Sequence, residues 1–203
     1  GMAITVHHSG VTSLPAAATV IVNRDGMVQV LIGFTEIGTC STTTLAQICA
    51  EVSGIKFDDI TVVATKNTDT IPYACMTGAS ITATMGGSAV RIAALDAKRQ
   101  LLEMGAEKLR VKPEDVDIKD SRVYLKANPE KGIDLKLILS HITSPSVIGK
   151  AGRHDIPSIG SIILQTMVAF ADVEVDTETG EVKVLRLVSC QDSGRIINPD
   201  VCE

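Results

Sequence analysis

Three β-hairpin patterns, separated by helical patterns, constrain the fold of this chain more than any other feature. Each has two apolar, β-branched runs around a turn, and they lie at residues 18–23 with 27–34, 116–125, and 162–176 with 181–190. The turn signals are Asp25-Gly26, Asp120-Ser121 and the segment 177–180. Asp-Gly pairs favour the backbone angles that tight hairpins need. Hairpins interleaved with helices predict an α+β fold with mixed sheets.

The third hairpin has the clearest strand pattern. Near its turn, valines alternate with charged residues, which is typical of strands with one face in water. The alternation fades at 162–164 and 187–188. We therefore expect these two ends of the hairpin to be covered on both faces.

Two main helices are predicted. Leu45, Ile48, Cys49 and Val52 follow helical spacing, and this first helix should end at Gly54. The second helix is predicted over 81–109, before Pro113, with one apolar face made of Ile81, Met85, Ala89, Ile92, Leu95, Leu102, Ala106 and Leu109.

The other segments are shorter. We predict a strand at 60–64, a short helix at 134–141 capped by Asp134, and loops at 66–78 and 143–161. No repeat or linker divides the chain, so residues 2–203 are expected to form a single domain. Gly1 precedes Met2 and is expected to be the remnant of a purification tag.

Composition excludes several functional classes. Hydrophobic residues make up 45% of the chain but aromatic residues only 2%, so a base-stacking surface is not expected. A net charge of -5 argues against nucleic-acid binding. No apolar run approaches the roughly 20 residues that span a bilayer. The five cysteines are irregularly spaced, which predicts reduced thiols in a cytoplasmic protein rather than disulfides or a zinc site.

Two predicted helix starts have the composition of an anion-binding site. The first lies within 35–44 and the second within 77–82, and their candidate contact residues are Gly38, Thr39, Cys40 and Ser41, then Thr77, Gly78, Ala79, Ser80 and Thr82. Helix N-termini present unpaired N–H groups, and small residues let a ligand approach the backbone. The alternative is ordinary capping of each helix by serine and threonine.

Other candidates are weaker. The pair His7-His8 lacks a third metal ligand, and His141 and His154 are expected at the surface. The segment that begins at Cys190 follows an apolar strand. It is a candidate nucleophile or ligand-contacting loop, but a buried, inert cysteine is expected at a strand end. Glu36 and Asp69 are candidate acid/base residues without an evident partner. The sequence therefore assigns no metal ligand and no catalytic residue.

Three segments, which follow one another in the family's order, resemble the molybdopterin-binding large subunits of the xanthine dehydrogenase and aldehyde oxidase family. They lie at 33–55, 69–90 and 173–199, and carry the motifs Gly33-Phe34-Thr35-Glu36-Ile37-Gly38, Thr77-Gly78-Ala79-Ser80, Val173-Glu174-Val175-Asp176, Thr179-Gly180-Glu181-Val182 and Asp192-Ser193-Gly194. The match runs roughly from Ala18 to Pro199. Where the family usually has Gly-Gln-Gly, this chain has Gly38-Thr39-Cys40.

The resemblance implies a molybdopterin-type molybdenum cofactor, held by the two helix starts, in an oxidoreductase with iron–sulfur and flavin subunits. The family's catalytic glutamate loop has no counterpart in the chain. We therefore hypothesise one lobe of a molybdenum hydroxylase that needs another lobe or chain to complete its site. An exposed apolar face, and hence a homo-oligomer of the isolated chain, is expected.

Two alternatives stay open. One is a non-catalytic remnant or assembly module that has the same fold and binds no cofactor. The other is an unrelated anion- or nucleotide-binding domain, which ranks last because no phosphate-binding glycine fingerprint is present.

Overall fold

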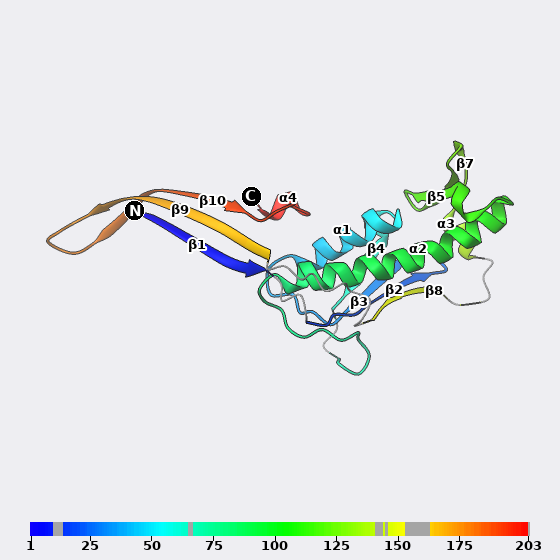
Figure 1. Ribbon diagram of the computed structural model, residues 1–203, viewed down its shortest axis with the longest axis horizontal. Coiled ribbons are helices and arrows are strands. Elements are labelled where there is room, and N and C mark those ends of the chain that lie inside the picture. Colours follow the sequence, from blue (N-terminus) through cyan, green and yellow to red (C-terminus); the bar gives the residue numbers. More distant parts are fainter. Residues whose placement is uncertain (10–13, 65–66, 141–143, 145, 153–162, 203) are drawn as a thin grey trace.

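The computed structural model describes residues 1–9, 14–64, 67–140, 144, 146–152 and 163–202. The chain forms a body, in which helices cover a four-stranded sheet, and a long three-stranded sheet that extends away from it (Figure 1). The predicted α+β fold with several sheets is confirmed, but only the four-stranded sheet is mixed, because the other two are antiparallel throughout. His141 and His154 lie outside the described residues.

The central sheet organises the body. Its strands are β2 (Ala18–Asn23), β3 (Val28–Ile32), β4 (Ile60–Val63) and β8 (Ser146–Ala151), in the order β4-β3-β2-β8. β3 and β4 are parallel and the other neighbours antiparallel. The alternating valines of β2 and β3 are completely buried at positions 20, 22, 28 and 30. The first predicted hairpin and the predicted strand at 60–64 are confirmed.

One strand of this sheet contradicts the sequence prediction. The loop predicted over 143–161 is wrong for residues 146–151, which form β8 and pair with β2. The strand is short and contains Gly149, which hides the alternating strand pattern in the sequence. The structure shows why this position is a glycine. A Cβ atom on Gly149 would lie 2.1 Å from the Ala93 carbonyl oxygen, because a helix crosses directly over the strand.

Two helices cover the sheet. α1 (Ser41–Ser53) packs against β4 and ends at Gly54, whose φ is 77°. α2 (Gly87–Leu109) packs against β2 and β8 and follows a π-helical turn, Thr82–Gly86. Both helices were predicted.

The predicted apolar face of the long helix is correct only in part. Leu95 is 42% exposed, while the buried face consists of Ala89, Val90, Ala93, Ala94, Ala97, Leu101, Gly105 and Ala106. Leu95 follows the buried Ala89 by six residues, which at 3.6 residues per turn places it roughly 240° around the helix from that residue, on another face. The small side chains on the buried face also let the helix approach the sheet closely.

A second, small sheet lies at the far end of α2. It consists of β5 (Val116–Lys119), β6 (Arg122–Leu125) and β7 (Asn128–Asp134), followed by α3 (Leu135–Leu139). The predicted hairpin and the Asp134 cap are confirmed, since Asp134 accepts a 2.8 Å hydrogen bond from the Lys136 N–H. β7 was not predicted, because its sequence is polar and contains proline and glycine. Short 3₁₀ turns lie at Phe57–Asp59 and Pro113–Asp115.

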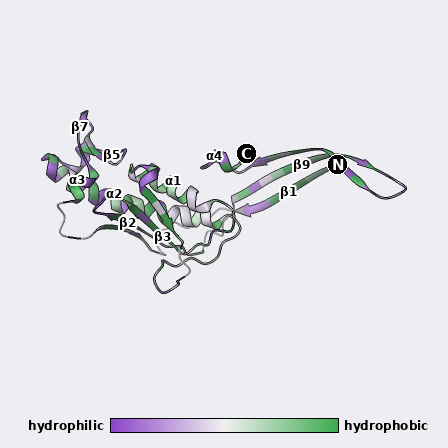
Figure 2. Ribbon diagram, turned by 180° about the vertical axis from the view of Figure 1, so that it is seen from behind, coloured by the Kyte–Doolittle hydropathy of each residue, from purple (hydrophilic) through white to green (hydrophobic). Residues whose placement is uncertain are grey.

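The third predicted hairpin forms the extended sheet. β9 (Ile163–Val175) and β10 (Val182–Asp192) pair as expected, and β1 (Met2–Ser9), which was not predicted, adds to the other edge of β9. A one-turn helix, α4 (Pro199–Cys202), follows. Hydrophobic residues occur along these exposed strands (Figure 2).

We expected the hairpin to be covered on both faces at 162–164 and 187–188. This prediction is wrong for the described residues. Leu164 is 60% and Leu187 66% exposed. The strands of this sheet contact chiefly one another, because the sheet projects beyond the helices of the body (Figure 1).

Candidate functional site

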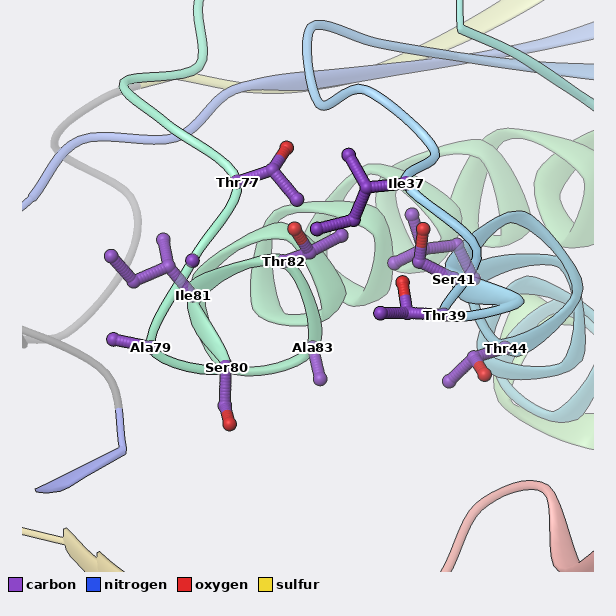
Figure 3. Close-up of a pocket in the computed structure, with 12 residues that line it drawn as sticks. Ile37, Thr39, Ser41, Thr44, Thr77, Ala79, Ser80, Ile81, Thr82 and Ala83 are labelled. Atoms are coloured by element: carbon purple, nitrogen blue, oxygen red, sulfur yellow. The ribbon is translucent and has the colours of Figure 1, made fainter. Parts of the chain in front are cut away.

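The two predicted helix starts meet at one cavity of about 360 Å³. On the α1 side it is lined by Ile37, Thr39, Ser41, Thr44 and Leu45, and on the side that leads into α2 by Thr77, Gly78, Ala79, Ser80, Ile81, Thr82 and Ala83. Figure 3 shows the two walls facing each other, with hydroxyl groups on both. Hydroxyls that donate and accept hydrogen bonds, interspersed with aliphatic side chains, can hold a ligand that has both polar and apolar surface.

Two contacts hold the walls together. The Thr77 hydroxyl accepts a hydrogen bond from the Thr35 N–H and donates one to the Thr35 carbonyl, both at 3.1 Å. The Phe34 ring lies against Gly86, where a Cβ atom would be 2.8 Å from the ring. The segment that leaves β3 is therefore fastened to the start of the long helix, and the Thr77 hydroxyl serves this connection.

The first helix start is capped by a carboxylate from within the chain. Glu36 Oε1 accepts hydrogen bonds from the N–H groups of Gly38 at 2.8 Å and Thr39 at 2.7 Å. Its Oε2 accepts from the Ser41 hydroxyl at 2.8 Å and the Thr42 N–H at 3.1 Å. The sequence indicated donors at this start but not that Glu36 turns back to meet them.

These hydrogen bonds set the charge of Glu36. Desolvation raises the pKa of its carboxyl group, but the hydrogen bonds from Ser41, Thr42, Gly38 and Thr39 outweigh it and lower the pKa to about 2. Glu36 is therefore ionised at neutral pH. It is a fixed anion and too weak a base for the acid/base role considered from the sequence.

The four contact residues predicted at the first helix start divide into two pairs. Thr39 and Ser41 line the cavity, whereas Gly38 and Cys40 do not and are exposed. Both of the latter have left-handed backbones, with φ of 95° and 53°. Gly38 and Cys40 thus shape the loop, and Cys40 does so in a conformation that favours glycine.

The second helix start retains an unpaired polar group. Thr82 is only 7% exposed, and its Oγ1 has no hydrogen-bond partner. The preceding residues Ala79 and Ser80 have positive φ angles of 45° and 58°. A buried hydroxyl without a partner costs about 1–3 kcal/mol, and Thr82 is one of the residues that line the cavity.

The extended sheet reaches the rim of this cavity. Gln165 of β9 donates a 3.3 Å hydrogen bond from Nε2 to the Ser80 hydroxyl. One end of the sheet is thereby connected to the strained segment that precedes α2.

The other sequence candidates that lie in the described part of the chain do not gather into a site. His7 and His8 are exposed and stack on each other with ring centroids 5.3 Å apart. Asp69 lies in a loop, where its N–H donates to the Asn67 side chain. Cys190 is exposed rather than buried, which corrects the prediction, and all five cysteines are free. Among the described residues, no three potential ligands gather around a metal position, and no helix is long and apolar enough to span a membrane.

Comparison with known proteins decides the family. The model of the molybdopterin cofactor-binding domain matches residues 1–203. The chain belongs to the molybdopterin cofactor-binding domain family. This assignment confirms the resemblance inferred from the three sequence segments.

Relatives within this family are much longer than the chain. The xanthine dehydrogenase molybdenum-binding subunit of Escherichia coli O157:H7 is 28% identical over 190 residues, which cover 93% of this chain and 25% of that protein. The nicotine 6-hydroxylase large subunit of Paenarthrobacter nicotinovorans is 29% identical over 192 residues, 92% of this chain and 23% of that protein. This chain therefore spans about a quarter of the length of the relatives that it matches.

A solved structure has the same fold. Quinoline 2-oxidoreductase from Pseudomonas putida 86 superposes with a TM-score of 0.84 at 24% identity, over 100% of this chain and 28% of that one. The superposition includes the extended sheet as well as the body, so the arrangement of both parts belongs to the fold.

Proposed function

We propose that the cavity between the two helix starts holds part of a molybdopterin-type molybdenum cofactor. The observation that carries the proposal is the buried, unpaired Thr82 hydroxyl on a wall that faces the hydroxyls of Thr39 and Ser41. The chain would contribute this part of the site to an oxidoreductase of the xanthine dehydrogenase type. As isolated, it would be inactive.

The residues fit the polar part of such a cofactor. Ser80 and Thr82, with the half-buried Gly78 and Ala79, would hold it on one side, and Thr39 and Ser41 on the other. When bound, the cofactor supplies the oxidation–reduction chemistry, hydroxylating a heterocycle or aldehyde with oxygen from water and passing electrons to iron–sulfur and flavin subunits. The chain's own residues would bind and orient it. No group in the described chain is placed to act as the general base.

The remaining three quarters of a molybdenum hydroxylase large subunit is the partner that we propose. The extended sheet exposes apolar side chains on its strands, among them Leu164 and Leu187, and so offers a docking surface. Since Gln165 connects this sheet to Ser80, a partner seated on it would lie next to the cavity. The complete cofactor site would then form between the chain and the partner.

Replacing Thr82 by valine tests the cofactor site. The substitution keeps the side-chain volume but removes the hydroxyl, so the unloaded chain should become about 1–2 kcal/mol more stable to unfolding. In a complex purified with the rest of the subunit, it should weaken cofactor binding by up to about tenfold, which is the loss of one good hydrogen bond, and so lower the molybdenum and pterin content. Urea denaturation and cofactor analysis measure the two effects.

Thr61→Val is the matched control, because Thr61 is an exposed threonine on β4, outside the cavity. It should leave the cofactor content unchanged. A fully assembled complex that contains neither molybdenum nor pterin would overturn the proposal, as would full loading of the Thr82→Val variant.

A second candidate function is an assembly module that binds no cofactor. One observation favours it: Thr39-Cys40 replaces the family's usual Gln-Gly. In that case only the double substitution Thr39→Gln, Cys40→Gly would bind a pterin. Binding by the unaltered chain in the assembled complex would exclude this candidate.

A further inference from the structure

The negative charge at the start of α1 comes from a residue outside the helix. Its first turn contains no acidic residue, and the N-cap residue Cys40 makes no side-chain capping bond. The charge comes instead from Glu36, which lies before the helix and receives the four hydrogen bonds described above. The positive end of a 13-residue helix is thus neutralised from within the chain.

The same carboxylate orders one wall of the cavity. Glu36 Oε1 accepts from the Thr39 N–H, and it lies 3.4 Å from the Thr39 hydroxyl, which also donates to it. Glu36 Oε2 accepts from the Ser41 hydroxyl. Two of the three hydroxyls on this wall are therefore fixed by the Glu36 side chain, while the third, that of Thr44, donates to the Cys40 carbonyl.

The opposite wall has no such charge. Among the cavity-lining residues none is charged, and the Thr82 hydroxyl is unpaired. A negatively charged group would meet a fixed carboxylate behind the α1 wall, whereas on the other wall it would meet the helix start and a free donor.

From these contacts we infer that Glu36 is a positioning residue that makes the cavity asymmetric. It holds Thr39 and Ser41 in place and excludes anionic groups from the α1 start, so that a ligand's phosphate is directed to the wall formed by Ser80 and Thr82. Only the identity of the ligand rests on the function proposed above, because the exclusion of anions depends on Glu36 alone.

Inorganic phosphate is the probe for a test by amide NMR on the full chain at pH 7. In the unaltered chain, phosphate should shift the amides of residues 79–84 and leave those of Thr39 and Thr42 unchanged. In Glu36→Gln, which keeps the shape but removes the charge, phosphate should also shift the Thr39 and Thr42 amides, with at least about a tenfold gain in affinity there.

Glu51→Gln is the matched control, since Glu51 is an exposed residue of the same helix and its loss changes the net charge equally. It should behave like the unaltered chain. The inference is overturned if phosphate already binds at Thr39 and Thr42 in the unaltered chain, or if folded Glu36→Gln gains no binding there.

A second variant covers the case in which Glu36→Gln does not fold. Glu36→Ala leaves space for a small carboxylate, so sodium formate should raise its melting temperature by several degrees over sodium chloride at equal ionic strength. The unaltered chain should show no such difference, and equal effects of the two salts on Glu36→Ala would contradict the inference. If phosphate fails to shift residues 79–84 in every variant, the phosphate-binding part of the proposed cofactor site fails, while the response at Thr39 and Thr42 still decides the role of Glu36.

Discussion

Cys40 has a backbone conformation that residues with a side chain disfavour. Its φ of 53° lies in the left-handed region, where an L-residue is destabilised by about 1–2 kcal/mol and glycine is not. The side chain is exposed and makes no capping bond, so nothing in the described structure offsets this strain. The family's usual glycine at this position would be free of it.

We therefore expect Cys40→Gly to raise the free energy of unfolding by about 0.5–1 kcal/mol, after the entropy cost of a more flexible unfolded chain. Urea denaturation measures the change. Cys40→Ala is the control, because alanine keeps the strained Cβ atom and should give no gain. A loss of stability in Cys40→Gly would contradict this explanation.

Glu36 makes the stability of the chain depend on pH in a defined direction. Its pKa is about 2 in the folded chain against an ordinary value of 4.5. Because the folded pKa is lowered, the stabilisation is fully present above about pH 4.5 and is lost as the pH falls toward about 2.

The difference in unfolding free energy between the unaltered chain and Glu36→Gln should accordingly shrink across this pH window. Urea denaturation at a series of pH values tests it, with Glu51→Gln as the reference. A difference that stays constant between pH 4.5 and 2 would mean that the Glu36 carboxylate is not held by these hydrogen bonds.

At the scale of the elements, β8 and α2 depend on one close approach. The missing side chain of Gly149 lets α2 lie directly on the strand, with the Ala97 nitrogen only 2.6 Å from the position of a Cβ atom. The neighbouring atoms belong to the helix backbone and cannot move aside independently.

Gly149→Ala should therefore destabilise the chain by about 3 kcal/mol, at the upper end of overpacking effects. The control is Lys150→Ala on the same strand, whose side chain is exposed and should matter by less than about 0.5 kcal/mol. Thermal unfolding compares the two. Equal stability of both variants would show that the helix lies further from β8 than the structure indicates.

At the scale of the whole molecule, the extended sheet is the part least able to exist alone in water. Its strands expose leucine and valine side chains, and few contacts connect it to the body. Apolar surface of this kind is normally covered by a partner. For the chain alone, a second copy of itself is the available cover.

We expect the isolated chain to form dimers or larger species in analytical ultracentrifugation, and Leu187→Lys to shift it toward the monomer. Leu137→Lys is the matched control, because Leu137 is similarly exposed at 61% but lies on α3, away from the sheet. A monomer at high concentration, or equal effects of both substitutions, would contradict a role of the sheet in association.

The sequence by itself determined most of the local structure and the composition of the site. Turn residues and periodicity predicted the hairpins, the two main helices and the end of α1 at Gly54, because these signals act within a few neighbouring residues. They also predicted two hydroxyl-rich helix starts, and short motifs in a fixed order indicated the family.

Tertiary structure alone decided how these pieces meet. β8 and β1 pair with strands more than 100 residues away in sequence, which no local pattern reports. The shared cavity arises because Thr77 bonds to Thr35, 42 residues away, and because Phe34 packs on Gly86. Glu36 has no evident partner in the sequence but is a fixed anion in the fold. Its pKa depends on hydrogen-bond donors that only the folded loop brings together.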